Sequence, residues 1–157
     1  MNAQPNETTS ASPINYALRI ERIFDAPRES VFRAWTEAEQ LAQWFHFTDD
    51  WKIEVVEIEL RVGGGYRVGW RAPDGGMWYE LAEFREIRPP ERLVHTCRVD
   101  EPGSRGDETL VTIEFHEEAG RTRVVLVQEG YHRAEQRDAH QRGWPGFLDQ
   151  LENFLRG

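Results

Sequence analysis

The chain has 157 residues, the size of one domain with a single hydrophobic core that has room for a pocket. Its 28 acidic and 19 basic residues give a formal charge of −9, which argues against nucleic acid or an anionic membrane surface as a partner. Cys97 is the single cysteine, so an intramolecular disulfide and a multi-cysteine zinc site are excluded, and a reducing cytoplasmic location is expected.

The beginning of the chain is predicted to be a tail. Residues 1–15 are polar and have neither a basic start nor an apolar segment, so they are expected to be disordered and not to form a signal peptide. No stretch approaches the ~20 apolar residues of a membrane-spanning helix. A single domain is predicted over residues 16–157, without membrane association.

A half-buried strand and two short helices are predicted first. The strand begins near Tyr16 and stops at residues 25–27, where Pro27 suits the first position of a helix. Residues 36–39 have the pattern of a capping box, in which the Thr36 hydroxyl bonds to the amide of Glu39 and starts a second helix. The apolar faces of the two helices are Val31, Phe32 and Trp35, then Leu41, Trp44 and Phe45.

Alternating apolar residues then predict an antiparallel meander. Turn signals at residues 73–76, 89–91 and 117–120 separate the strands. The predicted strands cover residues 52–61, 64–71, 77–87, 92–99, 108–116 and 121–129. With the first strand, the sheet has seven.

The last segment predicts the longest helix. Its apolar stripe consists of Trp144, Phe147, Leu148, Leu151 and Leu155. Pro145 cannot donate a hydrogen bond to Gln141, so either the helix is kinked there or it begins close to residues 143–144. His132 and His140 are expected to be solvated, flanking or starting this helix.

The element order predicts an α+β fold in which one face of a twisted sheet packs against the long helix. Several motifs also occur in the order of a known family, and together they span residues 16–156. They are residues 26–32, residues 35–36 with Leu41 and Trp44, residues 61–65, 89–93 and 120–122, and residues 143–144 followed by Phe147, Leu148 and Leu151. The chain resembles the START-like (helix-grip, SRPBCC) superfamily, in the branch named for the activator of heat-shock protein 90 ATPase.

The resemblance implies a curved sheet wrapped around the C-terminal helix, with a hydrophobic cavity between them. It does not imply one function, since this fold serves ligand carriers, cyclases, hydrolases and chaperone regulators. Two residues depart from the branch: Cys97 stands where an aromatic residue is common, and Pro145 interrupts a helix that usually continues. Both bear on the shape of the cavity.

The glycines of residues 61–70, RVGGGYRVGW, allow two interpretations. A phosphate-binding loop needs Lys and Ser or Thr after its second glycine and then a helix, but here a strand follows. A bend between two strands is favoured, because glycine adopts positive φ and admits close backbone approach. Tyr66, Val68 and Trp70 then point to the interior, and no nucleotide or other cofactor is implied.

The titratable residues give conditional candidates. The five histidines lack metal-site spacing, so no metal is implied. His95 and Cys97 share one face of a strand; Cys97 is expected to be a small buried hydrophobe and not a nucleophile, and His95 either anchors a ligand or is a satisfied core residue. Glu80 faces either a cavity or water, depending on the orientation of its strand. If Glu80 faces the cavity, burial raises its pKa and it pairs with His95 for acid and base chemistry.

Residue type and strand parity predict the walls of the cavity. They are Trp35, Trp44, Tyr66, Val68, Trp70, His95, Cys97, Phe115, Val124, Leu126, Gln128, Trp144 and Leu148, suited to an elongated or ring-shaped apolar molecule. Val125 and Val127 point the other way, where a homodimer or a chaperone partner would cover them, or where they are simply exposed.

Three functions follow as hypotheses. The first is a cytoplasmic protein that binds a hydrophobic small molecule between the sheet and the C-terminal helix. The second is a protein-interaction module that resembles the chaperone-activating domain. The third is an enzyme of the cyclase or hydrolase type that uses Glu80 and His95 in the same cavity.

Overall fold

A computed structural model describes residues 15–157, so the predicted tail lies outside the described residues except for Asn15. The strands are β2 (Tyr16–Phe24), β3 (Lys52–Ile58), β4 (Gly65–Arg71), β5 (Met77–Arg88), β6 (Arg92–Asp100), β7 (Thr109–Glu118) and β8 (Arg121–Tyr131). The helices are α1 (Arg28–Thr36), α2 (Ala38–Trp44) and α3 (Ala134–Leu155). This order confirms the predicted series of strands and helices.

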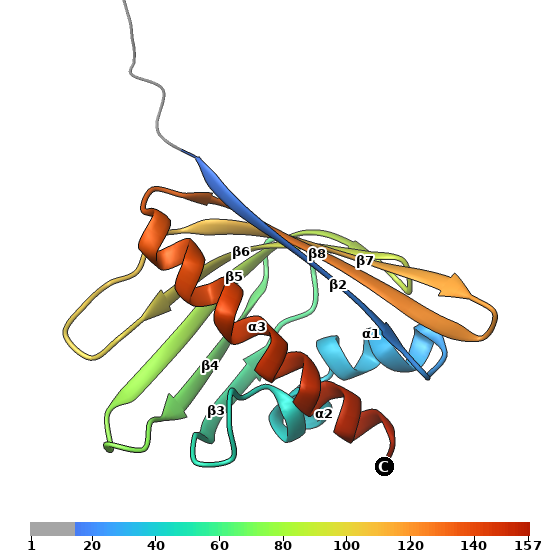
Figure 1. Ribbon diagram of the computed structural model, residues 1–157, viewed down its shortest axis with the longest axis horizontal. Coiled ribbons are helices and arrows are strands. Elements are labelled where there is room, and N and C mark those ends of the chain that lie inside the picture. The colour runs from blue at the N-terminus through green and yellow to red at the C-terminus, as the bar shows by residue number, and fades with distance from the viewer. Residues whose placement is uncertain (1–14) are drawn as a thin grey trace, which may run out of the picture.

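The seven strands form one antiparallel sheet in the order β2-β8-β7-β6-β5-β4-β3. The sheet is strongly curved, and α3 lies across its concave side (Figure 1). Helices α1 and α2 lie beside the C-terminal end of α3 (Figure 1). A register shift between Phe84 and Glu86 adds a bulge to the β5–β6 pair, a feature that bends a strand and increases its twist. The predicted α+β helix-grip fold is confirmed.

The starts of the two short helices differ from the prediction. Pro27 is the N-cap of α1, with an extended backbone, and the helix begins one residue later. The Thr36 hydroxyl donates to the Phe32 carbonyl at 2.9 Å, and the N-cap of α2 is Glu37, which makes no side-chain cap. The capping-box prediction was wrong because Thr36 still belongs to α1, where its hydroxyl bonds to the preceding turn.

Helix α3 begins at Ala134, nine residues before Gly143, where one alternative placed its start. It continues through Pro145, which lies on the exposed side together with Gln141. Water can therefore bond to the Gln141 carbonyl, which lacks its usual helical partner, and the helix tolerates the proline.

The three consecutive glycines form a bend between β3 and β4. Gly63 has a φ of +89°, and the Phe84 amide donates to the Gly64 carbonyl at 2.8 Å. A Cβ atom at Gly65 would lie 1.9 Å from the Ala82 carbonyl oxygen, so only glycine allows these strands to approach. The structural interpretation is confirmed, and Val68 and Trp70 are buried as expected.

One end of the concave face is closed by aromatic residues of α1 and α2. The Phe115 ring of β7 lies 5.2 Å from Phe32 and 5.8 Å from Trp35, measured between centroids. Trp35 lies 5.0 Å from Trp44, whose indole N–H donates to the Ala34 carbonyl at 2.8 Å. These rings fill the space between helices and sheet at this end, and none of the four is more than 6% exposed.

The outer face of β8 is covered by charged side chains of this chain. Val125 is only 7% exposed, and its partners on the two adjoining strands are Glu21 and Glu114. Arg123 forms an ion pair with Glu21 at 3.3 Å on the same face. Because the stems of such side chains cover apolar surface, Val125 is buried by this chain itself. Val127 is partly exposed, and a partner on this face remains a prediction.

Candidate ligand-binding site

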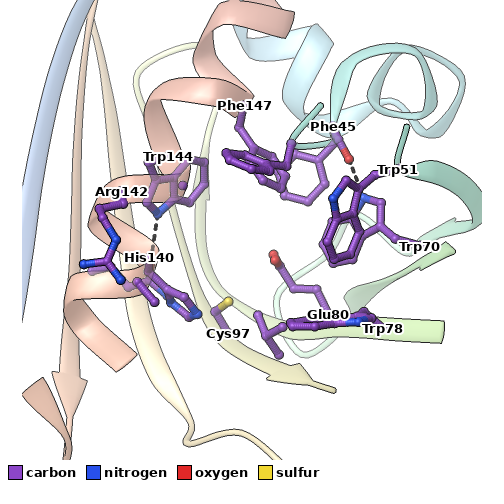
Figure 2. Close-up of a pocket in the computed structure, with 15 residues that line it drawn as sticks. Phe45, Trp51, Trp70, Trp78, Glu80, Cys97, His140, Arg142, Trp144 and Phe147 are labelled. Carbon is purple, nitrogen blue, oxygen red and sulfur yellow. Dashed lines mark hydrogen bonds between the residues drawn. The ribbon is translucent and has the colours of Figure 1, made fainter. Parts of the chain in front are cut away.

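A cavity of about 360 Å³ lies between the sheet and the first half of α3 (Figure 2). Strands β4, β5, β6 and β8 form its floor, α3 forms its roof, and the segment between α2 and β3 forms one side. Its lining residues are Phe45, Phe47, Trp51, Trp70, Trp78, Glu80, Cys97, Val99, Gln128, Ala139, His140, Arg142, Gly143, Trp144 and Phe147.

Aromatic rings dominate the wall next to α2. The Phe45 ring lies 5.0 Å from Phe147 and 5.7 Å from Trp70, and Trp51 packs edge-on against Trp78 at 5.2 Å. The Trp70 indole N–H donates to the Phe45 carbonyl at 2.7 Å. This contact ties β4 to the end of α2 and fixes the orientation of the Trp70 ring, so the aromatic wall is largely preformed.

The roof contains small and polar residues of α3. Ala139 and Gly143 lie one helical turn apart on the side that faces the cavity. His140 lies between them, with Nδ1 2.6 Å from the hydroxyl of Tyr131. Burial lowers the pKa of His140 to about 4, so its imidazole is neutral near pH 7. The prediction that His140 is solvated was wrong, because α3 begins earlier and carries this residue over the cavity.

A chain of hydrogen bonds forms a polar stripe on one wall. The Trp144 indole N–H donates to Gln128 Oε1 at 2.9 Å, and Gln128 Nε2 donates to the Thr109 hydroxyl at 2.9 Å. That hydroxyl donates in turn to the Cys97 carbonyl at 2.9 Å. Both ends of the Gln128 amide therefore have partners, and the group mainly positions Trp144 above the sheet.

Glu80 supplies the acidic group at the floor. It is only 7% exposed, and Figure 2 shows its carboxyl group directed into the space between the aromatic rings. The hydroxyl of Tyr66 donates a hydrogen bond to Oε2. Burial raises the pKa of Glu80 to about 7, although the bonds from Tyr66 and Cys97 oppose this rise. Of the two orientations predicted for this strand, the structure has the one that places Glu80 inward.

His95 does not reach the cavity. It is 2% exposed, and Nδ1–H donates to the Thr96 carbonyl at 2.7 Å. Its ring packs 5.1 Å from Tyr66 and 6.0 Å from Phe84. Burial lowers the pKa of His95 to about 4. His95 is thus the satisfied core histidine of the two alternatives, and no Glu80–His95 acid and base pair faces the cavity.

Cys97 lines the cavity as a neutral thiol. Burial and the nearby Glu80 carboxyl raise the pKa of its thiol well above the usual value. A thiol with a raised pKa is a poor nucleophile. The structure thus agrees with the prediction of a small buried hydrophobe. Because its side chain is smaller than an aromatic ring, it leaves space in the cavity.

The structure brings some of the predicted wall residues together and places others in the core. Trp70, Cys97, Gln128 and Trp144 line the cavity. The others pack in the closed core or behind the floor: Trp35, Trp44, Tyr66, Val68, His95, Phe115, Val124, Leu126 and Leu148. Strand parity identifies the concave face correctly, but it does not show which part of that face is covered by α1, α2 and the second half of α3.

Several lining residues were missed. Phe45 and Phe147 belong to predicted apolar helix faces, so an expectation that both helices border the cavity would have found them. Phe47 and Trp51 lie in an irregular segment and gave no periodic signal. Trp78 and Val99 share strand faces with Glu80 and Cys97, and that parity was the available signal.

Among residues 15–157, no three His, Cys, Asp or Glu side chains are grouped so that they could hold a metal ion. None of the helices in the same range is long and apolar enough to cross a bilayer.

Comparisons with known proteins agree with the architecture. Residues 25–156 match the family model described as activator of Hsp90 ATPase homolog 1-like protein. An uncharacterised protein of Rhizobium leguminosarum is 30% identical, with a TM-score of 0.81 over 91% of this chain and 95% of that chain. A protein of Chromobacterium violaceum is 28% identical, with a TM-score of 0.80 over 90% and 97%.

A third solved structure, from Nitrosomonas europaea, is 25% identical and has a TM-score of 0.74 over 89% of this chain and 94% of that chain. No protein with curated function matches the sequence. The family match spans most of the chain, and the solved structures share its curved sheet and long helix. The chain therefore belongs to the family of activator of Hsp90 ATPase homolog 1-like proteins, within the START-like superfamily.

Proposed function

We propose that this chain is a cytoplasmic protein that binds an apolar small molecule between the sheet and α3. The observation that carries the proposal is the cavity itself, which has a volume of about 360 Å³ and walls made largely of aromatic rings. Ligand sites in proteins are typically concave, mostly apolar and ~300–1,000 Å³ in volume. Trp51, Trp70, Trp78 and Trp144 therefore border a cavity of ligand size and do not fill it.

The other two hypotheses have less support. An enzyme that uses Glu80 and His95 lacks the geometry, because the His95 imidazole lies in the core with its Nδ1–H bonded to the Thr96 carbonyl. A chaperone partner rests on the family resemblance alone and remains a prediction. Binding by Trp70, Cys97, Gln128 and Trp144 is the part of the predicted site that the cavity supports.

Gly143 offers a direct test, because it lines the cavity and a Cβ atom there would meet no atom within 4 Å. Gly143→Leu is expected to occupy the cavity. Asn153→Leu adds a leucine of the same size on the exposed side of α3 and is the control. A library of apolar compounds is screened by thermal shift on the unmodified chain, and native mass spectrometry detects any molecule that copurifies.

Binding compounds are expected to raise the melting temperature of the unmodified chain and of Asn153→Leu by several degrees, by mass action. Gly143→Leu should lose this shift. If no compound binds the unmodified chain and it purifies without a bound molecule, the proposed function is wrong. Equal shifts with Gly143→Leu would show that binding occurs elsewhere.

A further inference from the structure

We propose that the cavity selects apolar molecules that carry a cationic amine, with the ammonium group placed between the Glu80 carboxylate and the faces of the surrounding rings. The inference rests on the proposed binding function and specifies the chemistry of the ligand. It depends on three features of the cavity: the position of its carboxylate, the rings around it, and the state of the other polar groups.

The position of Glu80 is the first feature. Its carboxyl group points into the cavity from β5, an interior strand of the sheet (Figure 2), and the Tyr66 hydroxyl donates a hydrogen bond to Oε2. A carboxyl group in an apolar cavity is costly to ionise unless a positive charge or several donors compensate for the lost water. The protein supplies hydrogen-bond donors to this carboxyl group, but none of the residues that line the floor has a cationic side chain. A bound ammonium group would supply that charge.

The aromatic rings are the second feature. Phe45, Trp51, Trp70, Trp78 and Phe147 border the same space as the carboxyl group (Figure 2). The faces of aromatic rings attract cations, and the attraction is larger where the cation is removed from water. Rings and carboxylate therefore favour the same charge. An anionic ligand would meet the carboxylate and the negative ring faces together.

The third feature is that two donors which would otherwise serve an anion are occupied. The Trp70 N–H is bonded to the Phe45 carbonyl, and the Trp144 N–H is bonded to Gln128. Arg142 is the one basic residue with a permanent charge that lines the cavity, and it lies on the exposed side of α3, where solvent screens it. Arg142 therefore compensates the negative charge of Glu80 less than an ammonium group bound at the floor would.

The pH dependence of binding follows from the groups around Glu80. The Tyr66 and Cys97 groups have raised pKa values and stay neutral below pH 8.5, while His140 and the core residue His95 have pKa values of about 4 and are neutral above pH 5.5. Glu80, with a pKa of about 7, is thus the group at the cavity whose charge changes in this interval.

An ammonium ligand binds the ionised carboxylate, so its affinity should increase as the pH rises through the pKa of Glu80. From about pH 5.5 to about pH 8.5 the ionised fraction rises roughly 30-fold, which sets the upper limit of the change in affinity. The affinity for a neutral alcohol should vary much less with pH. A ligand that accepts a hydrogen bond from the protonated carboxyl group, such as a ketone or an acid, should instead bind more tightly at low pH.

The experiment compares three probes with the same ring system: 2-(1-naphthyl)ethylamine, 2-(1-naphthyl)ethanol and 1-naphthaleneacetic acid. Their dissociation constants are measured by titration calorimetry at both pH values. At the higher pH, we expect the amine to bind at least about tenfold more tightly than the alcohol. This preference should be lost at the lower pH. If the alcohol or the acid binds as tightly as the amine, the selectivity is wrong while the binding function stands. If none of the three binds, the amine selectivity is contradicted, and the library screen and native mass spectrometry decide the binding function separately.

Glu80→Gln keeps the shape and an acceptor for Tyr66 but removes the negative charge. The substitution is expected to lower the affinity for the amine at least about tenfold at the higher pH, because a desolvated charge pair is lost. The affinity for the alcohol should be nearly unchanged. Glu57→Gln removes the same charge from an exposed position and should have no effect. Should Glu80→Gln fail to fold, the pH series on the unmodified chain still decides the question.

Discussion

The two halves of helix α3 face the same sheet but differ in how they meet it. The C-terminal half buries Leu148 and Leu151, which are 1% and 0% exposed, against the core closed by α1 and α2. The N-terminal half places Ala139, His140 and Gly143 above the cavity. The helix backbone is continuous across both halves, so side-chain size accounts for much of the difference.

The floor follows the same rule as the roof. Below the closed half, Phe115 of β7 packs against the aromatic rings of α1. Below the open half, β6 presents Cys97, whose side chain is much smaller than a ring, and β5 presents Glu80. The comparison indicates that one half of the interface supplies stability, while the other leaves the space in which the proposed ligand would bind. Substitutions should therefore affect the two properties separately.

The largest expected effect is a loss of stability in the closed half. Leu151→Ala should lower the free energy of unfolding by about 2–5 kcal/mol, because it removes a completely buried side chain from a packed region and leaves a void. Urea denaturation at pH 7 measures the change. Ligand affinity, measured where the variant is still folded, should change less than about threefold, since the residue does not line the cavity.

Leu155→Ala is the matched control, because Leu155 lies near the end of the same helix and is only partly buried. Its cost should be clearly smaller than that of Leu151→Ala. A similar loss for the two variants, or a large loss of ligand affinity with Leu151→Ala, would contradict the division of the interface into a stabilising half and a binding half.

The fold could be predicted from the sequence because the period of the apolar residues changes twice, and the observed strands differ from the predicted ones by a few residues at most. The start of α3 could not be predicted in the same way. Residues 134–142 contain few apolar side chains, and the prediction therefore placed one possible start near Gly143. This weak signal has a physical cause: Ala139 and Gly143 face a cavity and not a packed core, so no large apolar residue is needed there.

The site was only partly predictable for a related reason. Parity along β6 places Cys97 and His95 on one face, but only Cys97 meets the cavity, because Tyr66 and Phe84 pack against the His95 ring. Phe47 could not be predicted from the period of the apolar residues, because it lies in an irregular segment that borders the rim of the cavity. Which inward residues meet empty space depends on the curvature of the sheet and the path of α3.

The second effect concerns the open half and depends on pH. The pKa of Glu80 is about 7 in the folded chain against 4.5 in its unfolded reference, so the folded state holds the proton more tightly between these values. Glu80 therefore costs no stability below pH 4.5, and its cost grows as the pH rises and is complete above pH 7. Its size is on the order of 3 kcal/mol at most. Glu80→Gln should be more stable than the unmodified chain at high pH and similar to it at low pH.

Urea denaturation of both chains at a series of pH values measures this difference. His95 and His140 act in the opposite sense, because their pKa values of about 4 make the folded state lose stability as the pH falls below 6.5. Subtracting the unmodified chain from Glu80→Gln removes their contribution. A difference that does not increase with pH would mean that the Glu80 carboxyl group is not desolvated as its burial indicates.

The smallest expected effect compares two glycines of α3 that lie one turn apart. A Cβ atom at Gly143 would meet nothing within 4 Å, whereas one at Gly146 would lie 2.8 Å from Cδ1 of Phe47 and 3.2 Å from its carbonyl oxygen. Gly143→Ala should raise the free energy of unfolding by up to about 1 kcal/mol, because alanine favours the helix. Gly146→Ala has the same intrinsic gain but must displace the Phe47 segment, so it should be less stable than Gly143→Ala by about 1 kcal/mol or more.

Thermal and urea denaturation measure both variants, and each serves as the control for the other because the chemical change is identical. The pair also separates the roof from the rim: Gly143→Ala only narrows the cavity, whereas Gly146→Ala moves the Phe47 ring that borders it. Equal stability of the two variants would mean that the Phe47 segment yields without cost. The rim of the cavity would then be adaptable and only the aromatic wall around Phe45 and Trp70 would be preformed, because the hydrogen bond from the Trp70 indole N–H to the Phe45 carbonyl ties β4 to the end of α2 independently of Phe47.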